Sequence, residues 1–103
     1  MQVSYDDKYA DLAAAFQYEQ VRRLKAVLEQ HGVSREVAKA ICGDFTFELA
    51  MLLDQGELTV DGESYSPCLA FAPENDETLY AQPAAVEYHE YAFGTTADVF
   101  KLG

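Results

Sequence analysis

Tryptophan is absent from the 103 residues, and cysteine occurs only twice, at Cys42 and Cys68. The two cysteines lie far apart and form no CxxC pair, so the sequence offers neither a paired-cysteine redox motif nor a paired-cysteine zinc ligand. We expect two reduced thiols, with a disulfide or a reactive thiol as the alternative. The core must come from other apolar residues. These make up half of the chain and include six Phe and seven Tyr.

Long apolar runs are also absent, since no stretch approaches the roughly 18 residues that a membrane-spanning helix needs. The first seven residues, MQVSYDD, are acidic and lack the basic and apolar regions of a secretory signal. We therefore expect a cytoplasmic protein that does not enter a membrane. The length predicts a single domain, 1–103, with one core.

Basic residues are missing from most of the second half, because no Lys or Arg lies between Lys39 and Lys101. Residues 40–100 nevertheless carry twelve of the 18 acidic residues, and the formal net charge of the chain is −11. Carboxylates without basic neighbours create a field that points into solvent. Such a field disfavours nucleic acid and anionic lipid and attracts basic proteins. We therefore expect a basic protein partner and no direct binding of nucleic acid.

Two helices are predicted in the first half of the chain, at about 6–30 and 35–55. The short connection at 31–34 makes them antiparallel neighbours. Helical periodicity gives each of them one apolar stripe. The stripes are Tyr9, Leu12, Phe16, Leu24 and Val27 in the first helix, and Val37, Ala38, Ile41, Phe45, Leu49 and Leu52 in the second.

The ends of these helices carry suitable residues. Asp6 or Asp7 can cap the first helix and Ser34 the second, while Gly32 and Gly56 can end them. Gly43 interrupts the second pattern, so we expect a kink there or a fresh helix capped by Asp44.

After Gly56 the apolar period changes from 3.6 residues to two, which is typical of strands. Asp61-Gly62 is the residue pair preferred in a type I′ hairpin turn. We predict a small antiparallel sheet at about 57–61, 63–72 and 77–81, with the helical pair packed on it. The sequence Ala84–Phe93 fits a helix that Gly94 ends, or a strand; we prefer the helix. The fold class is therefore α+β, with a C-terminal helix or strand.

Histidine occurs at two positions, where acid–base or metal chemistry is sought first. His31 ends the first helix, and a capping role explains it. His89 lies beside Glu90 and near Glu87, so a small hydrolase or metal-dependent enzyme using His89 with Glu87 or Glu90 is one hypothesis. No HExxH, calcium loop, GxSxG elbow or glycine-rich phosphate loop is present. We expect no catalytic residue, no metal and no cofactor.

Tyrosines accompany the carboxylates of the second half, a composition typical of binding surfaces, although the rings could instead complete the core. We predict a small acidic non-enzymatic binding protein, of the inhibitor or immunity type, that occupies a basic surface of its partner. Bacterial immunity, antirestriction and anti-CRISPR proteins are similar in size and charge, which is an analogy of composition alone. The predicted contacts are Glu74, Asp76, Glu77, Tyr80, Glu87, Tyr88, Glu90 and Tyr91.

The only basic cluster lies where the two helices meet. It can pair with Glu19 and Glu29 at one-turn spacing, or it can form a pole for an acidic neighbouring subunit. The second possibility makes a homodimer conceivable, so a homo-oligomeric structural or accessory domain is a further alternative. The cluster consists of Arg22, Arg23, Lys25, Arg35 and Lys39.

Overall fold

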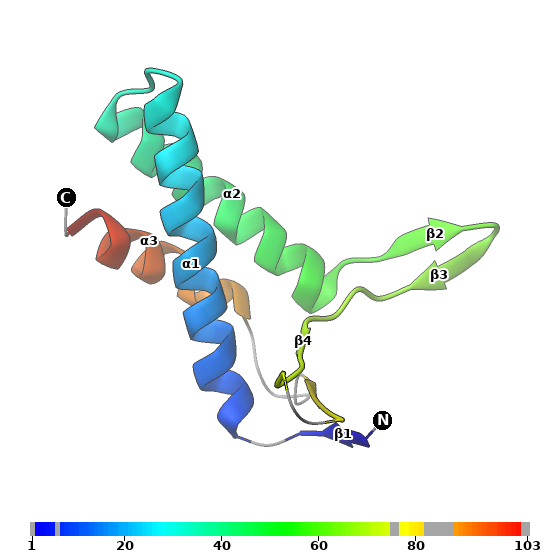
Figure 1. Ribbon diagram of the computed structural model, residues 1–103. Coiled ribbons are helices and arrows are strands. Elements are labelled where there is room, and N and C mark those ends of the chain that lie inside the picture. The colour runs from blue at the N-terminus through cyan, green and yellow to red at the C-terminus, as the bar shows by residue number, and fades with distance from the viewer. Residues whose placement is uncertain (1, 6, 75–76, 82–87, 102–103) are drawn as a thin grey trace.

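The computed structural model describes residues 2–5, 7–74, 77–81 and 88–101. Its helices are α1 (Lys8–Gln30), α2 (Arg35–Gln55), the short 3₁₀ helix η1 (Tyr88–Tyr91) and α3 (Ala92–Lys101). Its strands are β1 (Gln2–Ser4), β2 (Leu58–Val60), β3 (Glu63–Tyr65), β4 (Ala70–Phe71) and β5 (Thr78–Ala81). The predicted α+β class is confirmed (Figure 1).

Helices α1 and α2 follow the predicted boundaries closely and run antiparallel (Figure 1). Ser34 caps α2, because its Oγ accepts a hydrogen bond from the Val37 N–H at 3.3 Å. Asp7 occupies the corresponding position of α1, but its side chain makes no capping bond. Gly32 ends α1 with φ +77°, and the following Val33 N–H donates to the Leu28 carbonyl at 3.0 Å. This arrangement satisfies carbonyls at the helix end that would otherwise lack a partner.

The buried faces of both helices differ from the predicted stripes. Phe16 and Val27 of α1 are exposed, and so are four of the six stripe residues of α2. The sequence assigned the burial to large apolar side chains, whereas the structure buries mostly small or polar ones. The buried residues are Tyr9, Ala13, Gln17 and Val21 of α1, and Ala38, Cys42, Gly43, Thr46 and Ala50 of α2.

Helix α3 explains the choice of small residues, because it packs closely against α2. A Cβ atom at Gly43 would lie 3.0 and 3.1 Å from two carbons of the Phe93 ring. Gly43 therefore favours the close approach of the two helices. Helix α2 continues through it, so of the two predicted alternatives, a kink or a new helix capped by Asp44, the new helix does not form. The ring of Phe93 also stacks on Phe47 of α2, with 5.6 Å between centroids.

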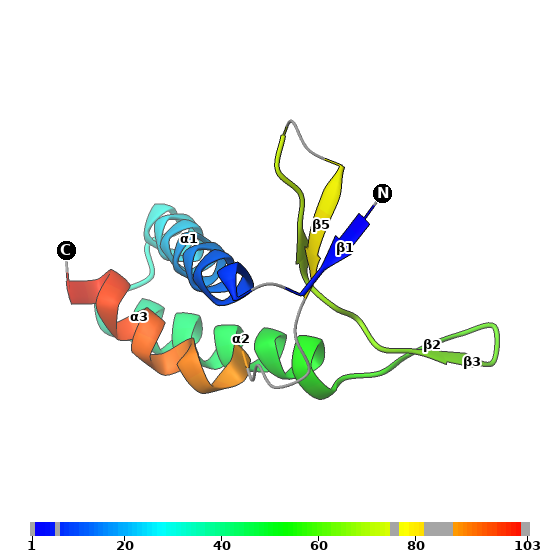
Figure 2. The ribbon, with the colours of Figure 1, turned by 90° about the horizontal axis from the view of Figure 1, so that it is seen from below.

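The helices α1, α2 and α3 lie together in Figure 2, and two apolar clusters join them. The first joins Val21 of α1, Cys42 of α2 and Phe100 of α3. The second joins Tyr9 of α1 and Ala50 of α2 to Tyr88 of η1. The C-terminal segment is thus a structural part of the core.

The helix predicted for Ala84–Phe93 overlaps η1 and the beginning of α3. Residues 82–87 lie outside the described part, η1 begins at Tyr88, and α3 runs to Lys101. Gly94 does not end a helix, because it lies inside α3 on a face where a Cβ would meet open space. The preference for helix over strand is correct for residues 88–93, although the predicted end is wrong.

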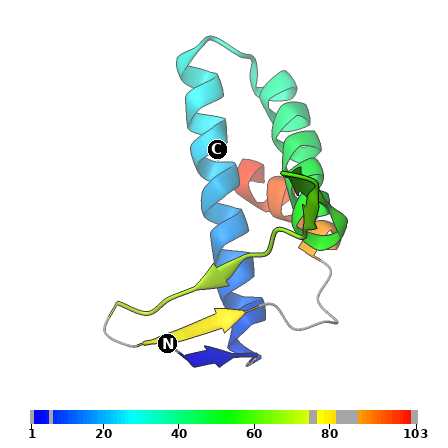
Figure 3. The same cartoon turned by 90° about the vertical axis from the view of Figure 1, so that its right-hand side faces the viewer.

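The strands form two separate units instead of one antiparallel sheet. β1 pairs in parallel with β5, and β4 pairs antiparallel with the other edge of β5. This three-stranded sheet crosses the N-terminal end of α1 (Figure 3), where Phe71 of β4 contacts the rings of Tyr9 and Phe16. The predicted strand 63–72 is divided into β3 and β4, since Pro67 and its neighbours leave the ladder between them.

Strands β2 and β3 form the other unit, a hairpin that projects beyond the C-terminal end of α2 (Figure 1). Asp61 and Gly62 have φ values of +51° and +81°, which confirms the predicted turn. All six strand residues of the hairpin are exposed. The radius of gyration, 15.4 Å, exceeds the roughly 13 Å of a compact domain of this length.

Within the described residues, no helix has the combination of length and apolar character required to cross a membrane.

Candidate functional site

The predicted contact residues are divided between two sides of α1. Tyr80 lines a shallow cavity of about 300 Å³ with Lys8 and Leu12, whereas Tyr91 lines another of about 220 Å³ with Ala10. Residues 8 and 12 lie on nearly the opposite side of a helix from residue 10. Glu74, Glu77 and Glu90 are exposed, and Asp76 and Glu87 lie outside the described residues. The described contacts therefore form two groups, near β5 and in η1.

Tyr88 belongs to the core and cannot contact a partner of the folded chain. Its side chain is 3% exposed and packs with Tyr9, Ala13 and Ala50. The sequence placed it among the contacts because it lies between charged neighbours, but the 3₁₀ turn directs it inward. Its hydroxyl finds no hydrogen-bond partner among the described residues, and burial raises its pKa above the usual value.

Most acidic residues of the basic-free segment face solvent. Of the twelve between positions 40 and 100, nine are exposed, two lie outside the described residues and one, Asp54, is largely buried. The exposed ones include three in the hairpin, where Ser64 donates to Glu57 at 2.7 Å and Tyr65 donates to Glu63 at 3.0 Å. These hydroxyl groups leave the negative charges in place, so the acidic field predicted from the sequence is present at the surface.

His89 is paired with Asp54, a residue that was not among the predicted site residues. The Nδ1 atom lies 2.6 Å from Asp54 Oδ2, and the His89 backbone N–H donates to the same oxygen at 2.7 Å. The Phe47 ring meets the imidazole edge-on at 5.8 Å. Asp54 stands in the last turn of α2, where a carboxylate opposes the helix dipole. That unfavourable position was the only sequence signal that it needed a partner.

The chemistry available to this pair is limited by its surroundings. An Asp–His pair can orient a general base, but a reaction also needs a cavity for the substrate. None of the three cavities described, of about 410, 300 and 220 Å³, is lined by His89. Among the described residues, no three His, Cys, Asp or Glu side chains are grouped to hold a metal. The pair attaches η1 to the end of α2.

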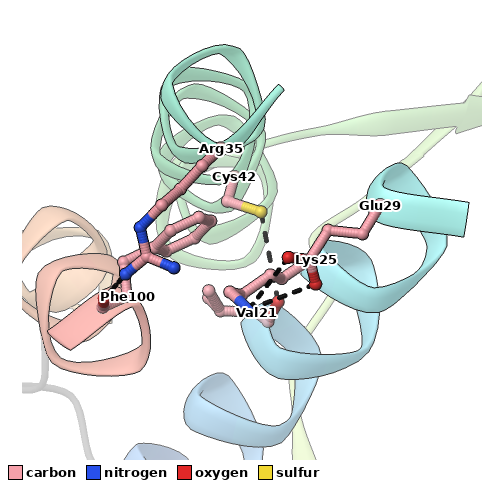
Figure 4. A network of polar contacts seen from close by, with 6 residues as sticks. All are labelled: Val21, Lys25, Glu29, Arg35, Cys42 and Phe100. Atoms are coloured by element: carbon pink, nitrogen blue, oxygen red, sulfur yellow. Dashed lines mark hydrogen bonds and ion pairs between the residues drawn. The ribbon is translucent and has the colours of Figure 1, made fainter. Parts of the chain in front are cut away.

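The cysteines are both free. Cys42 is buried between α1 and α2, and its Sγ lies 4.0 Å from the Val21 carbonyl (Figure 4). Burial raises the pKa of the Cys42 thiol, which disfavours the reactive thiolate. Cys68 is exposed in the segment between β3 and β4. The pairing of the two in a disulfide does not occur.

The basic cluster is partly used inside the molecule. Arg22 pairs with Glu19 at 2.5 Å and lowers the pKa of that carboxyl, while Lys25 pairs with Glu29 at 3.1 Å. These are the one-turn pairs that the sequence predicted.

The Phe100 ring of α3 lies between two cations of this cluster. Lys25 Nζ and Arg35 Cζ are each 5.5 Å from the ring centroid. Arg35 also donates to the Phe100 carbonyl (Figure 4). The cations therefore fix the end of α3, and the other two members of the cluster, Arg23 and Lys39, are exposed.

An exposed apolar surface, which the sequence assigned to the core, runs along α2. Val37, Ile41, Phe45 and Leu52 are 51%, 38%, 50% and 38% exposed, and we call these residues with half-buried Leu49 the α2 stripe. At 100° per residue, the stripe faces away from Gly43 and α3. Apolar patches of this kind on a small protein mark interaction sites.

The hairpin of β2 and β3 also exposes an apolar face. Leu58 pairs with Tyr65, and Val60 lies two residues from Leu58, so the three side chains share one face of the ribbon. All three are about half exposed. Helical periodicity identified the stripe correctly as apolar, but it could not tell whether the folded chain covers it.

No protein family model, curated protein or solved structure matches this chain.

Proposed function

We propose that the chain is a small, non-enzymatic binding protein that acts in the cytoplasm by covering a basic surface of another protein. It works as an inhibitor or immunity-type protein, and it does not bind nucleic acid. The observation that supports this proposal is the set of nine exposed acidic residues in a segment that holds no Lys or Arg. Such a surface accelerates encounter with a basic partner and rejects acidic ones.

Two parts of this surface are assigned to contact, the residues that precede β5 and the η1 turn. Glu74 and Glu77 precede β5, and both are exposed. In η1, exposed Glu90 stands next to Tyr91, whose ring is largely exposed. A tyrosine beside carboxylates suits a basic partner, because the ring supplies apolar area while the charges orient the complex.

The two groups lie on different sides of α1, so a single partner would have to extend around the N-terminal half of that helix. The alternative is that one group dominates. Charge reversal of each group separately distinguishes these cases. Loss of binding with both variants supports the extended contact, and loss with only one identifies the dominant group.

The experiment is capture from the source lysate, with the bound proteins identified by mass spectrometry. We expect basic proteins to be retained at low salt and released by about 0.5 M salt, where the Debye length falls to roughly 4 Å. The double variant Glu74→Lys/Glu77→Lys is expected to lose the captured protein at low salt as well.

The matched control is Asp11→Lys/Glu36→Lys, which changes the net charge equally on exposed positions of α1 and α2. It is expected to keep the captured protein if the acidic surface acts locally. Capture that persists in 0.5 M salt and in the Glu74→Lys/Glu77→Lys variant would contradict the proposal, because binding would not then depend on these charges.

A further inference from the structure

The α2 stripe has a symmetrical spacing about one residue. Phe45 stands at the centre of α2, which runs from Arg35 to Gln55. Ile41 precedes it and Leu49 follows it by four residues. Val37 precedes it by eight, and Leu52 follows it by seven. If a second α2 packs antiparallel with Phe45 facing Phe45, then Ile41 meets Leu49 and Val37 meets Leu52 of the other copy.

This arrangement is the isologous kind found in most homodimers, where the same patch on both subunits contacts itself. Antiparallel helices pack at 8–10 Å between axes, so the partly exposed apolar side chains from Val37 to Leu52 can interdigitate. Asp44 borders the stripe and Glu48 lies within it, between Phe45 and Leu52, so both charges oppose association. Both are exposed in the single chain, and at physiological salt the repulsion between exposed charges is screened over about 8 Å.

The charges at the two ends of α2 favour the same direction of packing. Residues 22–39, at the N-terminal end of α2, hold five bases and two acids, whereas the hairpin beyond its C-terminal end holds three acids and no base. The two poles are about 30 Å apart, since α2 rises 1.5 Å per residue. Antiparallel packing brings the acidic hairpin of one copy beside the basic end of the other, and parallel packing would place like poles together.

The exposed area of the single chain is larger than a compact monomer needs. It amounts to 6981 Å² for 11.5 kDa. A compact protein of this mass exposes about 5,800 Å². The excess of roughly 1,200 Å² exceeds the roughly 800 Å² that each partner contributes to a standard stable interface. Each copy therefore exposes enough area to form an interface of this size with a second copy.

We propose that the chain forms a two-fold homodimer in which the α2 stripes pack antiparallel about Phe45 and the hairpins extend over the partner's basic end. The hairpin supports this assembly, because an isolated two-stranded hairpin is marginally stable in water. In the dimer, the partner would cover the apolar face of the hairpin, which consists of Leu58, Val60 and Tyr65. The dimer leaves Glu74, Glu77, Glu90 and Tyr91 outside the α2 interface, so it is independent of the proposed partner binding.

The test uses the self-contact of Phe45. Sedimentation or light scattering of the wild-type chain is expected to give twice the 11.5 kDa mass, with dissociation on dilution. Phe45→Glu and Phe45→Lys should each be monomeric at the same concentration, since each places like charges on the two-fold axis. Mixed in equal amounts they should form a dimer again, because opposite charges then meet.

Tyr91→Glu serves as the matched control, since it also replaces a half-exposed ring by a carboxylate but lies outside the stripe. It is expected to remain dimeric, and circular dichroism should show unchanged helix in all variants. A monomeric wild-type chain at the highest concentration would overturn the proposal. So would a dimer that survives both Phe45 variants, or a mixture of the two that stays monomeric.

Discussion

His89 directs two hydrogen-bonding groups, its imidazole Nδ1 and its backbone N–H, at the same oxygen of Asp54. The Asp54 side chain is almost fully buried, so its loss leaves polar groups of η1 without a partner. We expect Asp54→Ala to lower the free energy of unfolding by about 2–3 kcal/mol. Urea denaturation followed by circular dichroism measures this change.

Asp54→Asn should lose less, since the amide oxygen still accepts the backbone N–H. The exposed Asp44 of the same helix provides the control, and Asp44→Ala should change stability by no more than about 0.5 kcal/mol. Equal losses at positions 44 and 54 would show that the contact with His89 does not anchor η1.

Gly43 and Phe93 form a second test, in which two effects compete. Alanine at position 43 gains about 1 kcal/mol of helix propensity, but its Cβ enters the space of the Phe93 ring. We expect Gly43→Ala to be neutral or destabilising in the natural sequence. In a Phe93→Ala background the same change should stabilise by about 1 kcal/mol. A double-mutant cycle measured by denaturation gives the coupling directly, and a coupling of zero would contradict the close contact.

Gln17 links α1 to the C-terminal elements from a fully buried position. Thr95 Oγ1 donates to Gln17 Oε1 at 2.6 Å, and Gln17 Nε2 donates to the Tyr88 carbonyl at 3.4 Å. We expect Gln17→Met to lower the free energy of unfolding by about 2 kcal/mol, because both partners lose a hydrogen bond while the volume is kept.

Adding Thr95→Val should recover part of that loss, since it removes the unpaired hydroxyl. Gln30→Met, at an exposed position of the same helix, is the control and should have little effect. No recovery in the double variant would mean that the Thr95 hydroxyl is satisfied elsewhere.

The buried Tyr9 predicts a loss of stability in alkali. Burial, with a further contribution from Asp54, raises its pKa from 10.0 to about 12. The unfolded chain therefore releases the proton first, so that stability is complete below pH 10 and falls as the pH rises from 10 toward 12. Denaturation at several pH values should show this slope, and Tyr9→Phe should reduce it. A slope unchanged in Tyr9→Phe would assign the effect to other groups, of which Tyr88 is the first candidate.

Periodicity and turn residues were sufficient to predict the helices, the Asp61-Gly62 turn and the α+β class, because these depend on local chemistry. The packing faces could not be predicted in the same way. A helix wheel selects large apolar side chains such as Phe45, whereas the close contact of Phe93 with Gly43 depends on a helix fifty residues later. Gln17 was absent from the predicted apolar stripe of the first helix, and its partner Thr95 lies 78 residues later in the chain.

The candidate site shows the same division between local and distant information. The excess of acidic residues was visible in the sequence and is present at the surface. The burial of Tyr88 and the pairing of His89 with Asp54 could not be predicted, because they depend on how the chain folds between positions 54 and 89. Strand β1 was missed because three residues carry no alternation that can be recognised, and its partner β5 lies near the other end.

The parallel pairing of β1 with β5 has a consequence for the order of folding. Joining Gln2 to Thr78 closes a loop of about 76 residues, which costs about 4 kcal/mol of chain entropy before any contact in the sheet is made. Helices α1 and α2, by contrast, are joined by a turn of four residues. The helical hairpin can therefore assemble early, while the residues of β1 are among the last to reach their final place.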